Sequence, residues 1–325
     1  MTARLTIDRI LCPTDFSESA ARALRLAVGL ARWWGARVTV LHVVAPSLST
    51  TAGLPSLAPF DEAALRAQAE EDLATFVAPV LHEPVTVEKK LRLGDPAREI
   101  QAVAKGAGLL VMGTHGRSGF EHLMLGSVTE TLLRRAPCPV ITVSGAPRPT
   151  TRRTLFKRVL CAADLGEGSE EVIAFALAMA EESEAEVILL HVIEGLPDAG
   201  TTARVGLPVP DSERLQVDLR SFALDRLRET VPDEVRALCP IREEVAEGGP
   251  AREILRVATE GQADLIVMGA HSRGPLGRAF FGSTSNQVVR ESRCPVLTVR
   301  GAPRVRAQAG PEAVTRGAAA APKVS

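Results

Sequence analysis

Tyrosine is absent from this sequence, and aromatic residues make up only 3% of its 325 positions. Surfaces that bind nucleic acids combine clustered basic residues with aromatic rings on which bases stack. Here 38 lysines and arginines are balanced by 39 aspartates and glutamates, so the formal net charge is −1. We therefore expect no nucleic-acid partner.

Long apolar runs are also missing. No stretch approaches the ~20 consecutive apolar residues that cross a bilayer. The first fifteen residues, MTARLTIDRILCPTD, lack the apolar centre of a secretion signal. We expect a cytoplasmic protein that does not insert into a membrane.

The five cysteines form no C-x-x-C pair. Cys12 and Cys161 lie in apolar runs typical of strands, and Cys138 and Cys294 each precede a Pro-Val dipeptide. Free cysteines in such surroundings behave as small hydrophobic side chains, although metal binding and redox chemistry are the alternatives. We expect buried, structural cysteines.

One unit of sequence is present twice, which indicates duplication. Four segments of the first copy return in the second. They are RILCPTD (9–15) and RVLCAAD (158–164), VTVLHVV (38–44) and VILLHVI (187–193), GDPAREI (94–100) and GGPAREI (248–254), and CPVITVSGAPR (138–148) and CPVLTVRGAPR (294–304). We expect one domain at 1–147, a second at 154–304 and a disordered tail at 305–325.

Within each copy, short apolar runs alternate with helical patterns, which favours a doubly wound α/β domain with a parallel sheet. A helix is predicted at 61–78, and Asp95-Pro96 should begin another, since both residues favour a helix start. The stretches 45–60 and 194–212 are expected to be mobile loops. SVTE (127–130) has the pattern of a capping box, with Ser127 as N-cap.

The stretch VMGTHGRSGFEHLMLGSVTE (111–130) places Gly113, Gly116 and Gly126 around a predicted strand end and helix start, followed by Ser127. Ligands of open parallel sheets bind beyond the carboxyl ends of the strands. A helix start offers free N–H groups that suit phosphate oxygens. The alternative is that the glycines are only turn residues. The P-loop pattern G-x-x-x-x-G-K-S/T does not occur.

The spacing G-x2-G-x9-G-S, together with PTDFS (13–17) and LHVV (41–44), resembles the universal stress protein family. The two copies suggest a tandem-domain member. The resemblance implies two tandem doubly wound domains, each with a five-stranded parallel sheet of order 3-2-1-4-5 flanked by helices. It also implies ATP, or ADP or AMP, as the ligand, and paired domains.

The resemblance also implies roles for residues of the first copy. Asp15 would meet the adenosine, with Pro13 and Thr14 shaping the wall, and Val43 and Met112 would contact adenine. The residues expected to line ribose and phosphates are Gly113, Gly116, Gly126, Ser127 and Val128. Arg117 is either a counter-charge for phosphate or a solvated loop residue, and His115 lies near the sugar or is exposed. His42 and His191 are expected in the core or at its rim.

The second copy departs from the motif. It retains Asp164, Val192, Met268, Gly269, Gly282 and Ser283 at the matching positions. Ser272 replaces the middle glycine, Ala162 replaces the proline and Thr284 replaces the valine. If position 272 requires a glycine conformation, serine costs about 1–2 kcal/mol. We expect the second site to bind more weakly.

The leading hypothesis is a nucleotide-binding stress-response regulator whose ligand biases conformation or the choice of protein partner, with slow ATP hydrolysis at most. Mg²⁺ could accompany the nucleotide, and Asp15 is the best metal candidate, but no Walker-type lysine is present. One alternative is a ligand-free scaffold that acts through protein partners. The other is an adenylating enzyme, whose H-I-G-H and S-G-G-x-D-S signatures are absent.

The last predicted strands, 139–143 and 295–299, are apolar edges that would otherwise invite aggregation. We expect them to pair in antiparallel fashion within one chain, as in a pseudo-twofold dimer. Association of two chains into a homodimer stays open.

Overall fold

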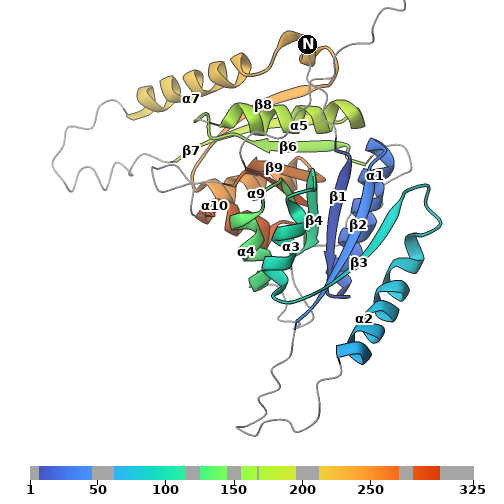
Figure 1. The fold of residues 1–325 in the computed structure, drawn as a ribbon. Helices are drawn as coiled ribbons and strands as arrows, with labels where there is room; N and C mark the ends of the chain where they lie inside the picture. The colour runs from blue at the N-terminus through green and yellow to red at the C-terminus, as the bar shows by residue number, and fades with distance from the viewer. Residues whose placement is uncertain are drawn as a thin grey trace, which may run out of the picture.

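In a computed structural model, the chain forms an α/β fold in which helices flank a single twisted sheet (Figure 1). The structure describes residues 7–45, 62–114, 125–144, 155–166, 168–194, 212–270 and 281–300. The stretches predicted to be mobile loops, apart from their end residues, and the predicted disordered tail lie outside these ranges.

Strands and helices alternate in each half. The first half contains β1 (Arg9–Thr14), α1 (Glu18–Trp34), β2 (Arg37–Val44), α2 (Glu62–Val77), the 3₁₀ helix η1 (Ala78–Val80), β3 (Val87–Leu93), α3 (Pro96–Ala104), β4 (Leu109–Gly113), α4 (Ser127–Arg135) and β5 (Val140–Val143). The second half contains β6 (Arg158–Ala162), α5 (Ser169–Ser183), β7 (Glu186–Ile193), α7 (Ser212–Glu229), α8 (Asp233–Arg236), β8 (Ile241–Glu247), α9 (Pro250–Glu260), β9 (Leu265–Gly269), α10 (Ser283–Glu291) and β10 (Val296–Val299).

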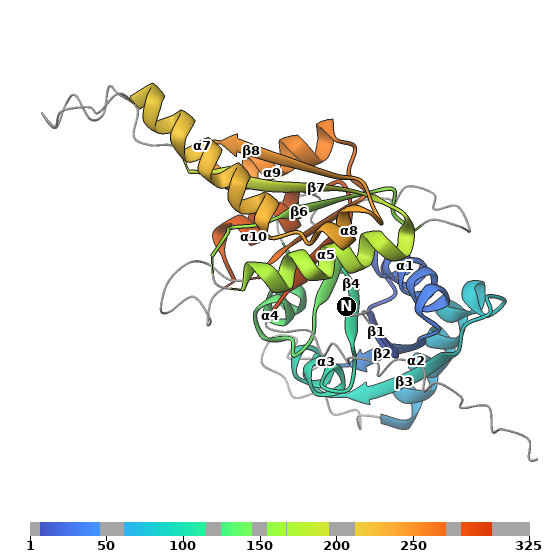
Figure 2. The same ribbon diagram turned by 90° about the horizontal axis from the view of Figure 1, so that it is seen from above.

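The ten strands form one sheet in the order β3-β2-β1-β4-β5-β10-β9-β6-β7-β8. Within each half the strands are parallel, and the predicted order 3-2-1-4-5 is confirmed in both. The halves join where β5 and β10 pair in antiparallel fashion, with Ile141 opposite Leu297. β3 and β8 are therefore the two ends of the sheet, on opposite sides of the molecule (Figure 2).

Local sequence explains several helix ends. Ser17 caps α1 by accepting a hydrogen bond from the backbone N–H of Ala20 at 3.2 Å. Gly35 ends α1 in the left-handed conformation, with φ 64°. Asp95 caps α3 by accepting from the N–H of Arg98 at 2.9 Å, and Pro96 occupies the first helical position as predicted.

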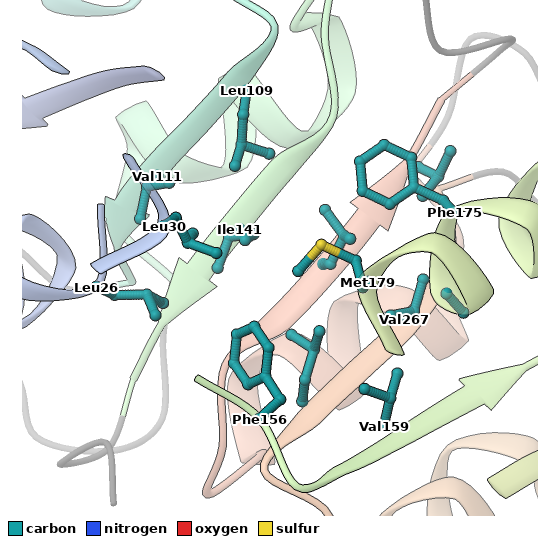
Figure 3. Close-up of a cluster of buried hydrophobic side chains, with 14 of the residues drawn as sticks. Leu26, Leu30, Leu109, Val111, Ile141, Phe156, Val159, Phe175, Met179 and Val267 are labelled. Atoms are coloured by element: carbon teal, nitrogen blue, oxygen red, sulfur yellow. The ribbon is translucent and has the colours of Figure 1, made fainter. Parts of the chain in front are cut away.

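The core lies on both faces of the sheet, and each face carries one cluster of buried side chains that includes residues of both halves. On one face, α1 packs on β5 and α5 packs on β10, the two strands that meet at the junction between the halves. Leu26 and Leu30 of α1 approach Ile141 of β5, opposite Phe175 and Met179 of α5 (Figure 3). The two halves thus share a core.

All five cysteines are free thiols. The prediction of buried cysteines is confirmed for Cys12, Cys138, Cys161 and Cys239, whereas Cys294 is half-buried. Burial raises the pKa of each of the first three thiols to about 12, which makes them unreactive. Among the described residues, no helix is long and apolar enough to cross a membrane.

Candidate functional site

A cavity of about 270 Å³ opens at the carboxyl ends of β1, β2 and β4. It is lined by Pro13, Thr14, Asp15, Ser17, Ser19, Ala20, Leu41, His42, Val43, Pro96, Ile100, Met112, Gly113, Gly126, Ser127, Val128 and Thr129. These include every first-copy site residue predicted from sequence that the structure describes. The predicted residues His115, Gly116 and Arg117 lie outside the described ranges.

The turn after β1 sets the position of Asp15. The Oγ1 of Thr14 accepts from the N–H of Phe16 at 2.9 Å, and Oδ1 of Asp15 accepts from the N–H of Ser17 at 3.0 Å. Phe16 adopts a left-handed backbone with φ 67°, which a bulky side chain rarely does. Leu165 does the same in the second half, with φ 56°. The strained turn is therefore a shared feature of the two copies.

A histidine at the rim of each half links two strands. Nδ1 of His42 lies 2.8 Å from the backbone oxygen of Thr14, and Nδ1 of His191 lies 2.8 Å from that of Ala163. Because a carbonyl oxygen only accepts, Nδ1 is the donor in both cases and Nε2 is the remaining ring nitrogen. His42 thus holds the end of β2 against the end of β1 while forming part of the cavity wall.

The start of α4 differs from the prediction. The N-cap is Gly126, whose C=O accepts from the N–H of Glu130 at 2.9 Å, so Ser127 is the first helical residue. No side-chain hydrogen bond caps this helix. The predicted capping box is therefore wrong, because the box begins one residue too late, and Glu130 instead forms an ion pair with Arg134. The first turn of α4 faces the cavity through Ser127 and Val128.

Gly113 and Gly126 both line this cavity, but glycine is favoured at the two positions for different physical reasons. A Cβ on Gly113 would collide with Oγ of Ser19 and lie 2.9 Å from that residue's carbonyl carbon. Gly113 is therefore required by the close approach of β4 to α1. A Cβ on Gly126 would meet only ordinary contacts, at 3.6 Å from the oxygen of Thr114 and 3.8 Å from Oγ1 of Thr129. Packing does not require Gly126, whose bare backbone faces the cavity.

A second cavity, of about 420 Å³, occupies the equivalent place in the other half. It is lined by Ala162, Ala163, Asp164, Gly168, Ser169, Glu171, Val172, Leu190, Val192, Glu194, Pro250, Ile254, Met268, Gly269, Ser283, Thr284, Ser285 and Val299. Of the predicted residues, Gly282 is the N-cap of α10 and is not part of this lining. Ser272 lies outside the described ranges.

The second cavity is wider where the first helix of its half begins. Gly168, at the position that corresponds to Ser19, is the N-cap of α5 with φ 88°, so α5 begins later than α1. A Cβ on Gly269 would lie 3.7 Å from Val172, an ordinary contact, in place of the collision at Gly113. The later helix start accounts for the extra space.

The second lining is also more acidic. It contains Asp164, Glu171 and Glu194, whereas Asp15 is the only carboxylate of the first lining. Arg22 stands at the first-half position that corresponds to Glu171, and there it pairs with an exposed glutamate of its own helix. A polyphosphate would meet more negative charge in the second cavity.

Sequence reasoning missed the residues contributed by α1 and α3: Ser17, Ser19, Ala20, Pro96 and Ile100. It also missed Glu171 and Glu194 in the second half. The available signal was that α1 and α3, like α4, begin at the carboxyl edge of the sheet. Within the described ranges, no group of three or more His, Cys, Asp or Glu residues is arranged to hold a metal ion.

Comparisons with known proteins agree on one family. The model of the universal stress protein family matches residues 6–144 and 155–300. A universal stress protein of Mycolicibacterium smegmatis is 29% identical over 303 residues, which are 90% of this chain and 96% of that protein. One of Thermus aquaticus is 36% identical over 149 residues, 45% of this chain and all of that protein. The crystal structure of a universal stress protein from Archaeoglobus fulgidus shares the fold, with a TM-score of 0.63, 24% identity and coverage of 90% and 96%.

Proposed function

The chain belongs to the universal stress protein family, and on that premise we propose that it binds ATP, or ADP or AMP, in the cavity of its first half. Nucleotide occupancy would bias the conformation of the protein or its choice of protein partner in a stress response. The second cavity would bind nucleotide more weakly.

The walls of the first cavity suit a purine. Leu41, Ile100 and Met112 are buried at its inner side, and Val43 lies beside them. Ligand cavities are mostly apolar, with a few polar groups that set orientation. Aliphatic side chains can therefore hold the base although aromatic residues are scarce, and Asp15 at the rim could accept a hydrogen bond from the ribose hydroxyls.

The bare backbone of Gly126 at the start of α4 is the observation that carries the proposal. A helix start presents unpaired N–H groups and the positive end of the helix dipole, which together favour anions. Glycine at this position is required neither by a left-handed backbone, since φ is −61°, nor by packing. Glycine is one of the residues preferred at an N-cap, and here its lack of a side chain also lets an anion approach the main chain.

Fast hydrolysis is not part of the proposal. Phosphoryl transfer needs a positioned water and groups that neutralise charge at the γ-phosphate. Among the described residues, the cavity lining contains no lysine or arginine and a single carboxylate, that of Asp15. Mg²⁺ bound to the phosphates would rely on Asp15 or on residues outside the described ranges.

The test is calorimetric titration of ATP into the wild type and into Gly126→Val. The valine side chain would fill the space beside the helix start, so the affinity of the first cavity should fall at least tenfold, which corresponds to about 1.4 kcal/mol. The matched control is Gly249→Val. Gly249 is the N-cap of α9, has an extended backbone and faces open space, so this variant should bind ATP as the wild type does.

Unchanged ATP affinity in a folded Gly126→Val protein would refute the assignment of the phosphate site. The scaffold alternative makes a different prediction for the freshly purified wild type. Mass spectrometry of the extracted protein would then find no ATP, ADP or AMP, and calorimetry would show no binding heat.

A further inference from the structure

The two ends of the sheet carry opposite charge. β3, at one end, has the sequence VEKKLRL, with three basic residues and one acidic residue. β8, at the other end, has the sequence IREEVAE, with three acidic residues and one basic residue. Within the described part of the chain, each has a partner strand on one side only, and they lie on opposite sides of the molecule (Figure 2).

Unpaired backbone groups of β3 point away from the molecule at alternate residues. The C=O of Thr86 and the N–H of Gly94 hydrogen-bond to β2, so the even-numbered residues between them face β2. The N–H and C=O groups of the odd-numbered residues, among them Lys89 and Leu91, therefore face outward. These groups are a template for another strand.

The same argument applies to β8. The C=O of Pro240 and the N–H of Gly248 hydrogen-bond to β7, so the odd-numbered residues of β8, among them Val245 and Glu247, present their backbone groups outward. All strands of one half run antiparallel to those of the other. A second copy that extends the sheet would thus bring its β8 antiparallel to β3.

We propose that β3 of one copy of this chain pairs with β8 of a second copy. In one register, the outward backbone groups of the two strands meet, the same faces of the two sheets align, and the side chains that face each other are complementary. It places Lys89 opposite Glu247, Leu91 opposite Val245, and Arg92 opposite Glu244. Cross-strand pairs of opposite charge and of apolar side chains each stabilise a sheet by about 0.2–1 kcal/mol. Pairing of β3 with β3, or of β8 with β8, would oppose like charges.

Exposed apolar side chains gather at the same two ends. In the described ranges, the exposed large apolar residues are Leu65, Leu81, Leu215, Val217, Phe222 and Leu238. Four of them lie on α2 and α7, which contact β3 and β8 respectively, whereas Leu81 follows η1 and Leu238 follows α8. α2 and α7 contribute Leu73 and Leu227 to the same face of the sheet, so they would flank the new junction and could cover these side chains.

The contact joins different surfaces of the two copies, so it leaves a free β3 at one end of the pair and a free β8 at the other. Such a contact does not close on itself and can continue to longer assemblies. The basic residues of β3 are available for it, since Lys89, Lys90 and Arg92 form no ion pair within the described part of the chain. Glu244, which is half-buried, pairs with the exposed Arg242 at 3.1 Å, and this pair could exchange partners.

The test is sedimentation velocity of the full chain over a roughly hundred-fold range of concentration. In about 0.05 M NaCl the weight-average sedimentation coefficient should rise with concentration. In about 0.5 M NaCl, where the Debye length is about threefold shorter, the rise should largely disappear. A wild type that stays monomeric throughout the low-salt series overturns the proposal, and the edge charges would then serve only to prevent pairing.

Two charge-reversal variants test the register. Lys89→Glu/Arg92→Glu and Glu244→Lys/Glu247→Lys should each be monomeric alone, because both ends then carry one sign of charge. An equimolar mixture should regain association, since an acidic end again meets a basic one. The control Arg25→Glu/Lys105→Glu makes the same change in net charge as Lys89→Glu/Arg92→Glu, but on α1 and after α3, and should associate as the wild type does.

The mixture is also a control for misfolding, because unfolded variants would not regain association on mixing. Association that survives reversal at either edge, or two folded variants that stay monomeric when mixed, would refute the pairing of β3 with β8.

Discussion

The backbone of Gly113 lies directly against Ser19, so closely that a Cβ on the glycine would collide with Oγ of the serine. Gly113→Ala should therefore destabilise the protein by about 1–3 kcal/mol, the usual cost of overpacking. Urea denaturation measures the free energy of unfolding. The matched control is Gly269→Ala, where the nearest atom would be 3.7 Å away and stability should hardly change. Equal losses in the two variants would mean that helix–strand contact is not the cause.

The residues that end α1 and α5 both adopt a left-handed backbone conformation, and substitutions at the two positions should change stability in opposite directions. Gly35 ends α1 with φ 64°, and Glu184 ends α5 at the corresponding position with φ 52°. Gly35→Ala should lower stability and Glu184→Gly should raise it, each by about 1 kcal/mol, because only glycine adopts this backbone without strain. A Cβ at Gly35 would meet nothing within 4 Å, so the effect there is one of backbone alone. Thermal unfolding of both variants checks the two signs.

The buried thiols predict a loss of stability at alkaline pH. Burial raises the pKa of Cys12 and Cys161 from 9.0 to about 12. Below pH 9.0 both thiols stay protonated, folded or unfolded. Between pH 9.0 and about 12 only the unfolded state releases its thiol protons, so the free energy of unfolding falls by about 1.4 kcal/mol per pH unit for each thiol. The free energy of unfolding of the variant Cys12→Ala/Cys161→Ala should fall less steeply over that range. An unchanged slope would contradict this account.

The acidic lining of the second cavity predicts how it would select among ligands, given the proposed nucleotide function. In a Gly126→Val background, Glu171→Gln/Glu194→Gln should strengthen ATP binding about fivefold, or ~1 kcal/mol, by removing two charges that repel phosphate. Adenosine, which has no phosphate, should bind as before. Calorimetry with both ligands separates the charge effect from a change of shape, which would alter both affinities.

The repeated pattern of short apolar runs was enough to predict the α/β class, and the family resemblance predicted the strand order of each half. The helix start at Asp95-Pro96 came from the residues themselves. The nine described first-copy residues that meet in one cavity were implied by the family resemblance, and they can meet because strand ends of a parallel sheet share one edge. The cap of α4 was misplaced by one residue. Ser127 and Gly126 are both good N-caps, and only the hydrogen bond from Glu130 to Gly126 decides between them.

Duplication, five short strands per half and a glycine-bearing motif beyond the fourth strand follow from the sequence alone, because side-chain periodicity and glycine are local properties of the chain. Tertiary structure decided the rest. It distinguished Gly113, which packing requires, from Gly126, which faces a cavity. It also made the second cavity wider, where α5 begins later, and brought Glu171 and Glu194 together with Asp164 in its lining. It also set the register of the predicted pairing between the last strands, with Ile141 opposite Leu297. These outcomes depend on contacts between segments far apart in sequence, which no local pattern encodes.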